Sequence, residues 1–365
     1  MTPAERRVLS AITLCRTAAL GGHVDVCRAC GHEHPAYNSC RNRYCPKCQS
    51  LAQEKWICAR AKRVLPAAHF HVVFTLPSEL RALARFRPKL VYAALFTAAS
   101  DTLLELGRSR LGAEFGVTMV LHTWTRDLRL HPHVHALVTA GGLANDGHWA
   151  PSNSKYLFPV DVMGALLRGK MMHALSRLHA RGHFEGFDGL RDPEAFARLM
   201  ARLAKIRWIV YAKRPFHHVD HVLRYLGRYT HRVGIANSRL VDVTGDAVTF
   251  RTKNGKTVTL APVEFLRRFL LHVLPDAFKK IRHYGLYAGA CVDTKLASAR
   301  AALTPARTPR EPSPDPCATD TGLWQSLVEQ LTGRDVRRCP VCDGPSVQRV
   351  LEPTLQRSSP RWDTS

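Results

Sequence analysis

The 365-residue chain has no long hydrophobic run and few acidic residues. It contains no stretch of about 18 uncharged apolar residues, the minimum for a membrane-spanning helix. Arg16 interrupts the apolar segment near the N-terminus, so we expect no secretion signal. Asp and Glu number 29 against 53 Lys and Arg, which gives a formal net charge of +24. These features predict a cytoplasmic protein with no membrane partner and with a polyanionic partner, of which nucleic acid is the first candidate.

A basic composition also has a second explanation, because an Arg-rich coding bias raises the net charge as well. Charge therefore supports binding to nucleic acid but indicates no chemistry. The sequence also lacks an internal repeat and a complete phosphate-binding loop. The segment "NGKT" at 254–257 resembles the end of such a loop, but Phe250 stands where its first glycine belongs. We expect no ATP-driven motor in this chain.

Composition divides the chain into three regions. Residues 1–60 hold a cysteine cluster, residues 61–295 alternate strand-like and helix-like segments, and residues 296–365 begin with a proline-rich linker. Periodicity predicts strands at 69–77, 116–125 and 128–142, helices at 85–106, 163–182, 193–211 and 218–233, and a hairpin at 237–260 with turns at Gly245-Asp246 and Asn254-Gly255. Helices and antiparallel strands on one core predict an α+β fold, preceded by a small N-terminal module.

The cysteines are unevenly distributed, and their number is odd. Six of the 11 fall between residues 15 and 48, a pattern that indicates metal ligation rather than disulfides in a reducing compartment. Cys27-x-x-Cys30 and Cys45-x-x-Cys48 are two knuckles separated by fourteen residues. This spacing predicts a tetrahedral site in which four thiolates hold a structural Zn²⁺ ion.

Other residues near these knuckles have more than one interpretation. Cys15 and Cys40 are possible ligands of a second site, although leftover cysteines near a zinc ion more often serve packing. The "CPVC" knuckle at 339–342 has no obvious second pair in the sequence. Basic residues lie between the N-terminal cysteines and are candidates for contacts with DNA phosphates: Arg41, Arg43 and Lys47. The alternative is a purely structural module.

The segment "LHPHVHALVTAGG" at 130–142 places histidines at alternating positions of a predicted strand. His131, His133 and His135 therefore lie on one face of that strand. Convergent imidazoles could bind a divalent cation and leave positions for a phosphate oxygen and water. A single buried histidine more often forms only a hydrogen bond in the core. The third ligand stays open between His122, Asp127 and a residue near the tyrosines described next.

The segment "VLRYLGRYTHRVGIAN" places Tyr225 and Tyr229 four residues apart, on one face of a predicted helix. Basic residues surround the two phenols and are candidate DNA contacts: Arg224, Arg228 and Arg232. Two phenols on a basic face suit covalent phosphoryl transfer, because the cations stabilise a phenolate and the charge that develops on phosphate. The alternative is an amphipathic helix whose tyrosines cover the core.

Taken together, these motifs resemble the insertion sequence 91 family, the two-tyrosine rolling-circle transposases of the HUH nuclease superfamily. The matching segments are "YNSCRNRYCPKCQ", "HVVFTLP", "LHTWTRDLRLHPHVHALVTAGGL", "VLRYLGRYTHRVGIAN" and "FLRRFLLHVLPDAFKKIRHYGLYA". They span residues 10 to 290, whereas the tail beyond 296 is not covered. The resemblance implies an HUH-type antiparallel sheet with flanking helices after an N-terminal zinc-binding module.

The resemblance also implies roles by position: His133 and His135 as ligands of Mg²⁺ or Mn²⁺, and Tyr225 and Tyr229 as nucleophiles. The implied activity is nicking and rejoining of single-stranded DNA through a 5′-phosphotyrosine, with element ends and target DNA as substrates. A host helicase and a location at the bacterial nucleoid would follow, while the oligomeric state stays open. Two other hypotheses are a metal-dependent nucleic-acid hydrolase without a covalent step and a non-catalytic zinc-finger DNA-binding protein.

Overall fold

A computed structural model describes most of the chain: residues 1–61, 63–153, 155–190, 192–216, 227, 235–303, 325, 328–329, 333–344 and 347–350. Contacts between residues divide the chain into two compact units. The larger unit consists of 60–230 and 263–309, and the smaller unit of 1–59, 231–262 and 310–365. The region limits predicted from composition, at residues 60 and 295, stay a prediction.

The larger unit is built on a 6-stranded sheet in the order β11-β4-β5-β3-β7, with β6 paired to β5. Every neighbouring pair is antiparallel. The strands are β3 (His69–Thr75), β4 (Ala113–Trp124), β5 (Leu130–Ala144), β6 (Trp149–Pro151), β7 (Val210–Phe216) and β11 (Ile281–Gly285). The long strands β4 and β5 therefore lie at the centre, where both edges of each strand are paired.

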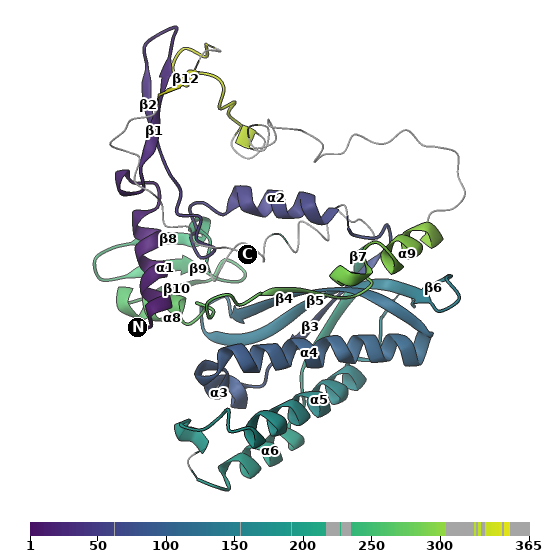
Figure 1. Ribbon diagram of the computed structural model, residues 1–365. Helices are drawn as coiled ribbons and strands as arrows, with labels where there is room; N and C mark the ends of the chain where they lie inside the picture. The colour runs from purple at the N-terminus through teal and green to yellow at the C-terminus, as the bar shows by residue number, and fades with distance from the viewer. Residues whose placement is uncertain are drawn as a thin grey trace. The chain divides into compact units, whose positions relative to one another are not determined.

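The larger unit also contains α-helices and short 3₁₀- and π-helical segments. They are η2 (Ser78–Leu80), α3 (Arg81–Phe86), α4 (Pro88–Leu106), η3 (Gly107–Leu111), α5 (Val160–Ala180), η4 (Asp188–Leu190), α6 (Ala195–Lys205), α8 (Pro262–Leu270), η6 (Gly289–Cys291) and α9 (Lys295–Leu303). Helix α4 runs along one face of the sheet, α5 packs against α4, and α6 packs against α5 (Figure 1).

The face of the sheet that the helices cover is apolar because the strands alternate. On β3, Phe70, Val72 and Phe74 are completely buried, and on α4 Leu95 and Phe96 are equally buried. Burial of side chains of this size stabilises the fold by about 1.5–3 kcal/mol each. The opposite face of the same strands carries histidines, and the candidate site lies on that face.

Helix α4 and the turn after it are long and apolar enough to cross a membrane, as judged by length and composition. Among the described residues this is the one helix of that kind, and 61% of its apolar window is buried inside the protein. Because α4 lies on the sheet, its composition is that of a core helix.

The smaller unit contains two three-stranded sheets. The first has the order β12-β1-β2 and the second β10-β9-β8. Its elements are α1 (Pro3–Leu14), η1 (Ala18–Leu20), β1 (Gly22–Cys27), β2 (Glu33–Tyr37), α2 (Ser50–Ala61), η5 (Asn237–Arg239), β8 (Leu240–Val243), β9 (Val248–Arg251), β10 (Thr257–Leu260) and β12 (Val347–Val350). Helix α2 continues past the boundary into the larger unit. The chain thus returns to the first sheet near its C-terminus, since β12 pairs with β1.

The α+β prediction is confirmed, and so are the strands predicted at 69–77, 116–125 and 128–142. The two predicted turns of the hairpin also occur: β8, β9 and β10 form a meander, and Asn254 and Gly255 have φ angles of 57° and 73°. The prediction that one helix spans 193–211 is wrong beyond Lys205. The residues from Val210 onward pair with β3 instead, so pairing in the sheet prevails over helical periodicity.

Candidate metal centres

Three histidines gather on the face of the central strands opposite the one that carries Phe70, Val72 and Phe74. His133 and His135 lie on β5, and His122 lies on β4 directly opposite His133. One ring nitrogen from each of the three lies within 4.8 Å of the others. The ring of His122 stacks on Trp124, with 4.6 Å between the centroids, which holds the imidazole in place. We call His122, His133 and His135 the imidazole cluster.

Hydrogen bonds orient two of these rings. His133 Nδ1 lies 2.6 Å from the backbone carbonyl of His131. A carbonyl only accepts, so Nδ1–H donates and the lone pair of Nε2 stays available to a metal ion. His135 Nδ1 lies 2.8 Å from Nε2 of His71, on the neighbouring strand β3. His71 thus occupies the position of an outer partner that fixes the orientation of a ligand.

Burial favours the neutral form of His133, His135 and His71. Burial lowers the pKa of His133 to about 4. The pKa of His135 is also well below its ordinary value, first through burial and then through the nearby His133, His71 and Lys213. Burial, with Lys213 and His133, lowers the pKa of His71 to about 4. A neutral imidazole is the form that ligates a metal ion, so the lowered pKa values of His133 and His135 favour metal binding near pH 7.

The structure separates the candidates for the third ligand. His122 joins the imidazole cluster, whereas Asp127 does not. The Asp127 carboxylate lies in the turn after β4, where it accepts from Thr125 Oγ1 at 2.5 Å and pairs with Arg129 Nε at 2.7 Å. His71 was missed by the sequence interpretation. Its signal is the alternation of His69 and His71 within "HFH", which puts both on the same face of β3 as His133 and His135.

The predicted nucleophiles Tyr225 and Tyr229 lie outside the described residues, and so do Arg224, Arg228 and Arg232. Within the segment 217–234 the structure describes Gly227, which is helical. The roles of these residues, and the helix predicted at 218–233, therefore stay predictions.

The smaller unit groups eight cysteines into two sets of four, in a different arrangement from the one expected. Cys45 and Cys48 lie with the two cysteines left without a firm role, Cys15 and Cys40. The predicted partners of Cys45 and Cys48, Cys27 and Cys30, lie instead with the "CPVC" knuckle, Cys339 and Cys342. The knuckle expected to have no second pair thus has one.

A β-hairpin accounts for this arrangement. Strands β1 and β2 pair from Gly22 with Tyr37 to Val26 with Glu33. Cys15 and Cys40 flank the open end of the hairpin, and Cys27 and Cys30 stand at its turn. Each extended residue adds about 3.3 Å, so a five-residue ladder puts the two ends too far apart to share one ion. We call the four cysteines at the open end the inner thiol group: Cys15, Cys40, Cys45 and Cys48.

The inner thiol group has the geometry of a structural zinc site. Cys40 Sγ and Cys48 Sγ lie 3.7 Å apart. Zn–S bonds of 2.3 Å in a tetrahedron place sulfur atoms about 3.8 Å from one another. Cys15, Cys40 and Cys45 are buried and pack with Ile12 and Leu20. A zinc ion bound there would connect helix α1, the hairpin and the loop before α2.

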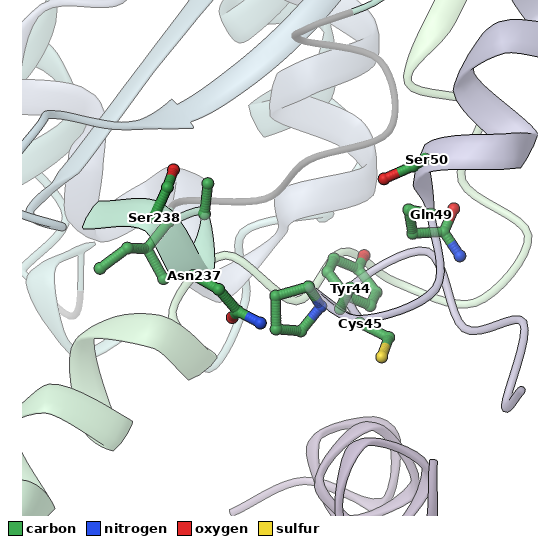
Figure 2. Close-up of a pocket in the computed structure, with 9 residues that line it drawn as sticks. Tyr44, Cys45, Gln49, Ser50, Asn237 and Ser238 are labelled. Atoms are coloured by element: carbon green, nitrogen blue, oxygen red, sulfur yellow. The ribbon is translucent and has the colours of Figure 1, made fainter. Parts of the chain in front are cut away.

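The predicted DNA contacts of this module are on the loop that carries Cys45. Arg41 and Lys47 are exposed, and the Arg43 guanidinium lies over the Tyr44 ring at 5.2 Å. Beside this loop is a pocket of about 200 Å³, shown in Figure 2. Its lining consists of Tyr44, Cys45, Pro46, Gln49 and Ser50 on one side and Ile235, Ala236, Asn237 and Ser238 on the other. The loop that carries Cys45 therefore lies against the turn that leads into β8.

Comparisons with known proteins relate both parts of the chain to transposases. A family model described as "Transposase zinc-binding domain" matches residues 1–76, and one described as "Putative transposase" matches residues 116–295. The chain belongs to the insertion sequence 91 family of transposases. Such enzymes bind DNA, cleave it and transfer strands, and a structural Zn²⁺ ion fits the zinc-binding domain.

Two relatives bear this out along most of the chain. The chain is 42% identical over 379 residues to "Putative transposase y4qJ" of Sinorhizobium fredii, with 100% of this chain and 94% of the relative covered. It is 28% identical over 324 residues to "Transposase for insertion sequence element IS801" of Pseudomonas savastanoi pv. phaseolicola, with 84% and 76% covered. No solved structure matches the chain.

Proposed function

We propose that the chain nicks and rejoins single-stranded DNA through a 5′-phosphotyrosine intermediate and so moves an insertion sequence by rolling-circle transposition. The observation that carries this proposal is the imidazole cluster on strands β4 and β5 of the sheet. The cluster lies on the same sheet as β7, the strand that leads into the segment with the two tyrosines. The basic composition and the transposase relatives support DNA as the substrate.

The donor set fits a divalent transition metal. Among the described residues the cluster consists of three imidazoles, a donor set that suits Mn²⁺ better than Mg²⁺, which prefers oxygen ligands. The ion would polarise the scissile phosphate and stabilise its developing charge. His122, His133 and His135 would hold that ion, while His71 would keep the ring of His135 in its orientation.

The covalent step follows from the chemistry of a phenol. The Oη atom of Tyr225 or Tyr229 would lose its proton to solvent and attack the scissile phosphorus. A bond from Oη to phosphorus forms, the bond from phosphorus to the 3′ oxygen breaks, and that oxygen takes a proton to become a 3′-hydroxyl. Because the phosphotyrosine retains the energy of the broken bond, rejoining needs no ATP. Strand separation in the cytoplasm would depend on a host helicase.

The decisive test is to trap the covalent adduct on single-stranded DNA that carries the end of the element. We expect Tyr225→Phe and Tyr229→Phe each to reduce transposition, and the double variant to form no adduct. Tyr211→Phe is the matched control, because Tyr211 is an exposed tyrosine on β7. A double variant that still forms the adduct would refute the nucleophile assignment, and a wild-type protein that cleaves without any adduct would favour the hydrolase.

Substitutions of the clustered histidines test the metal site separately. His122→Ala, His133→Ala and His135→Ala should each lower cleavage at least 100-fold while DNA binding stays within about 2-fold, because affinity comes from many phosphate contacts. His131→Ala is the control on the same strand, since His131 is outside the cluster and contacts Arg81 at 3.2 Å. Cleavage that is equal with and without a chelator contradicts the metal assignment.

A further inference from the structure

An N-terminal and a C-terminal segment of the chain meet at a second group of four thiols. Cys27 and Cys30 stand at the turn of the β1–β2 hairpin, and Cys339 and Cys342 lie close to the C-terminus. Cys27 Sγ is 3.6 Å from Cys342 Sγ, although the residues are 315 positions apart in the sequence. Cys30 Sγ is 3.7 Å from Cys339 Sγ, across 309 positions. We call these four cysteines the outer thiol group.

The distances indicate a metal site and not disulfides. A disulfide needs its sulfur atoms about 2.05 Å apart. Sulfur atoms on the corners of a tetrahedron around Zn²⁺ are about 3.8 Å apart, close to both observed distances. One sulfur atom from each of the four residues lies within 4.8 Å of the other three, so the complete ligand set of a four-thiolate site is present.

The two knuckles also have the same backbone conformation. In the first, the Gly31 N–H donates to the Cys27 carbonyl at 2.9 Å, and in the second the Asp343 N–H donates to the Cys339 carbonyl at 3.0 Å. Gly31 has a φ angle of 71° and Asp343 one of 55°. Each Cys-x-x-Cys turn therefore closes with a left-handed residue four positions after its first cysteine. The match means that both turns present their two sulfur atoms in the same way.

A strand pairing supports this contact independently of the cysteines. Strand β12 follows the second knuckle and pairs antiparallel with β1, with Val24 opposite Val350 and Cys27 opposite Val347. The C-terminal knuckle is thus fixed to the hairpin by backbone hydrogen bonds as well as by its sulfur atoms. If the two thiol pairs were close only by coincidence, there would be no reason for β12 to pair in register with β1.

We propose that Cys27, Cys30, Cys339 and Cys342 bind a second structural zinc ion, which joins the C-terminal segment to the N-terminal hairpin. The whole sequence of the larger unit lies between the two halves of this site. The zinc-binding domain matched at residues 1–76 is then incomplete on its own, because two of its eight metal-binding thiols come from the other end of the chain. Metal binding at this site requires that both ends of the chain are folded together.

The test counts zinc in the purified full chain by release with a thiol-specific mercurial, which leaves metal on imidazoles uncounted. We expect two zinc ions per chain in the wild type. We expect one in Cys339→Ser/Cys342→Ser, one in Cys27→Ser/Cys30→Ser and still one in the quadruple variant, because both pairs serve the same ion. Cys58→Ser/Cys291→Ser is the control, since neither residue belongs to a thiol group, and it should keep two.

The pattern of losses separates this site from the alternative in which Cys27, Cys30, Cys45 and Cys48 share one ion. In that case the wild type would release one zinc ion, Cys339→Ser/Cys342→Ser would release the same amount, and Cys27→Ser/Cys30→Ser would release none. A Cys339→Ser/Cys342→Ser variant with the wild-type zinc count therefore overturns the proposal.

Pulsed alkylation followed by mass spectrometry gives a second readout that reports on folding as well. In Cys27→Ser/Cys30→Ser, Cys339 and Cys342 should be alkylated at least 10-fold faster than in the wild type. Cys40 should stay protected, because the inner thiol group keeps its ion. Rapid alkylation of Cys339 and Cys342 in the wild type, at the rate of the free thiol Cys58, would contradict the site directly.

Discussion

If the imidazole cluster binds metal as proposed, His71 should control how tightly it does so, although His71 is not one of the three clustered histidines. Its Nε2 atom lies 2.8 Å from Nδ1 of His135, and the two rings are nearly parallel, with an interplanar angle of 8°. If His71 Nε2 accepts from His135 Nδ1–H, the Nε2 atom of His135 is directed to the metal ion. Loss of such an outer partner typically weakens metal binding 10- to 100-fold, or about 1.4–2.8 kcal/mol.

Two substitutions separate the hydrogen bond from packing. His71→Leu removes the acceptor in a position that is only 2% exposed, whereas His71→Gln keeps an amide oxygen near the position of Nε2. We expect the dissociation constant for Mn²⁺, measured by electron paramagnetic resonance, to rise 10- to 100-fold in His71→Leu and less than about 5-fold in His71→Gln. Cleavage by His71→Leu should recover at saturating Mn²⁺, because the group acts on metal occupancy and not on the reacting atoms.

His283 provides the control on the same face of the sheet. It contacts Thr118 at 3.0 Å and Arg60 at 3.1 Å and is not part of the cluster, so His283→Gln should leave Mn²⁺ affinity within about 2-fold. Wild-type affinity in His71→Leu, or equal weakening in His71→Leu and His71→Gln, would refute the positioning role. A fall in metal affinity with His283→Gln as large as with His71→Leu would mean that general loss of packing is the cause.

Two further predictions concern stability. His69 Nδ1–H donates to the Ala67 carbonyl and Nε2 accepts from the Tyr287 hydroxyl, and burial lowers the His69 pKa to about 4. The unfolded chain therefore binds the extra proton between pH 6.5 and 4, so His69 costs stability as pH falls, by at most about 1.4 kcal/mol per pH unit. In urea unfolding, His69→Gln should lose less stability than the wild type over that interval, and parallel curves would contradict this. Gly285 has a φ angle of 56°, and an added Cβ would lie 1.9 Å from the Phe115 carbonyl oxygen. Gly285→Ala should therefore lower the free energy of unfolding by at least about 1–3 kcal/mol, whereas Gly289→Ala, which has open space, should change it little.

The strands that carry the imidazole cluster were predictable because one residue type repeats with their period. His131, His133 and His135 alternate with Val134 and Ala136, and an alternation of this kind assigns both the strand and the face. The segment 206–211 gave no such signal. Its apolar residues continue the helical spacing of α6, and the choice of strand depends on the exposed edge of β3, which is distant in sequence.

The sequence alone did not decide between His122 and Asp127 as the third member of the cluster. Asp127 and His122 are both close to His133 in sequence, and a carboxylate is a common metal ligand. The choice between them depends on the register of β4 against β5, which places His122 opposite His133 and Asp127 in the turn beyond. Shifting a register by one residue moves every side chain to the other face, and sequence spacing does not contain the register.

Which cysteines group together depends on the distance in space between the knuckles, and this distance cannot be deduced from their spacing in the sequence. Cys-x-x-Cys spacing identifies each knuckle, because two sulfur atoms on one turn can reach a common ion. Which two knuckles share an ion depends on what lies between them. The residues from Cys30 to Cys45 are few, but they include β2, which extends the chain away from the turn of the hairpin. Cys339 is distant in sequence, yet β12 brings it back along β1 to within 3.7 Å of Cys30. A short extended segment thus separates two knuckles more effectively than a long folded one.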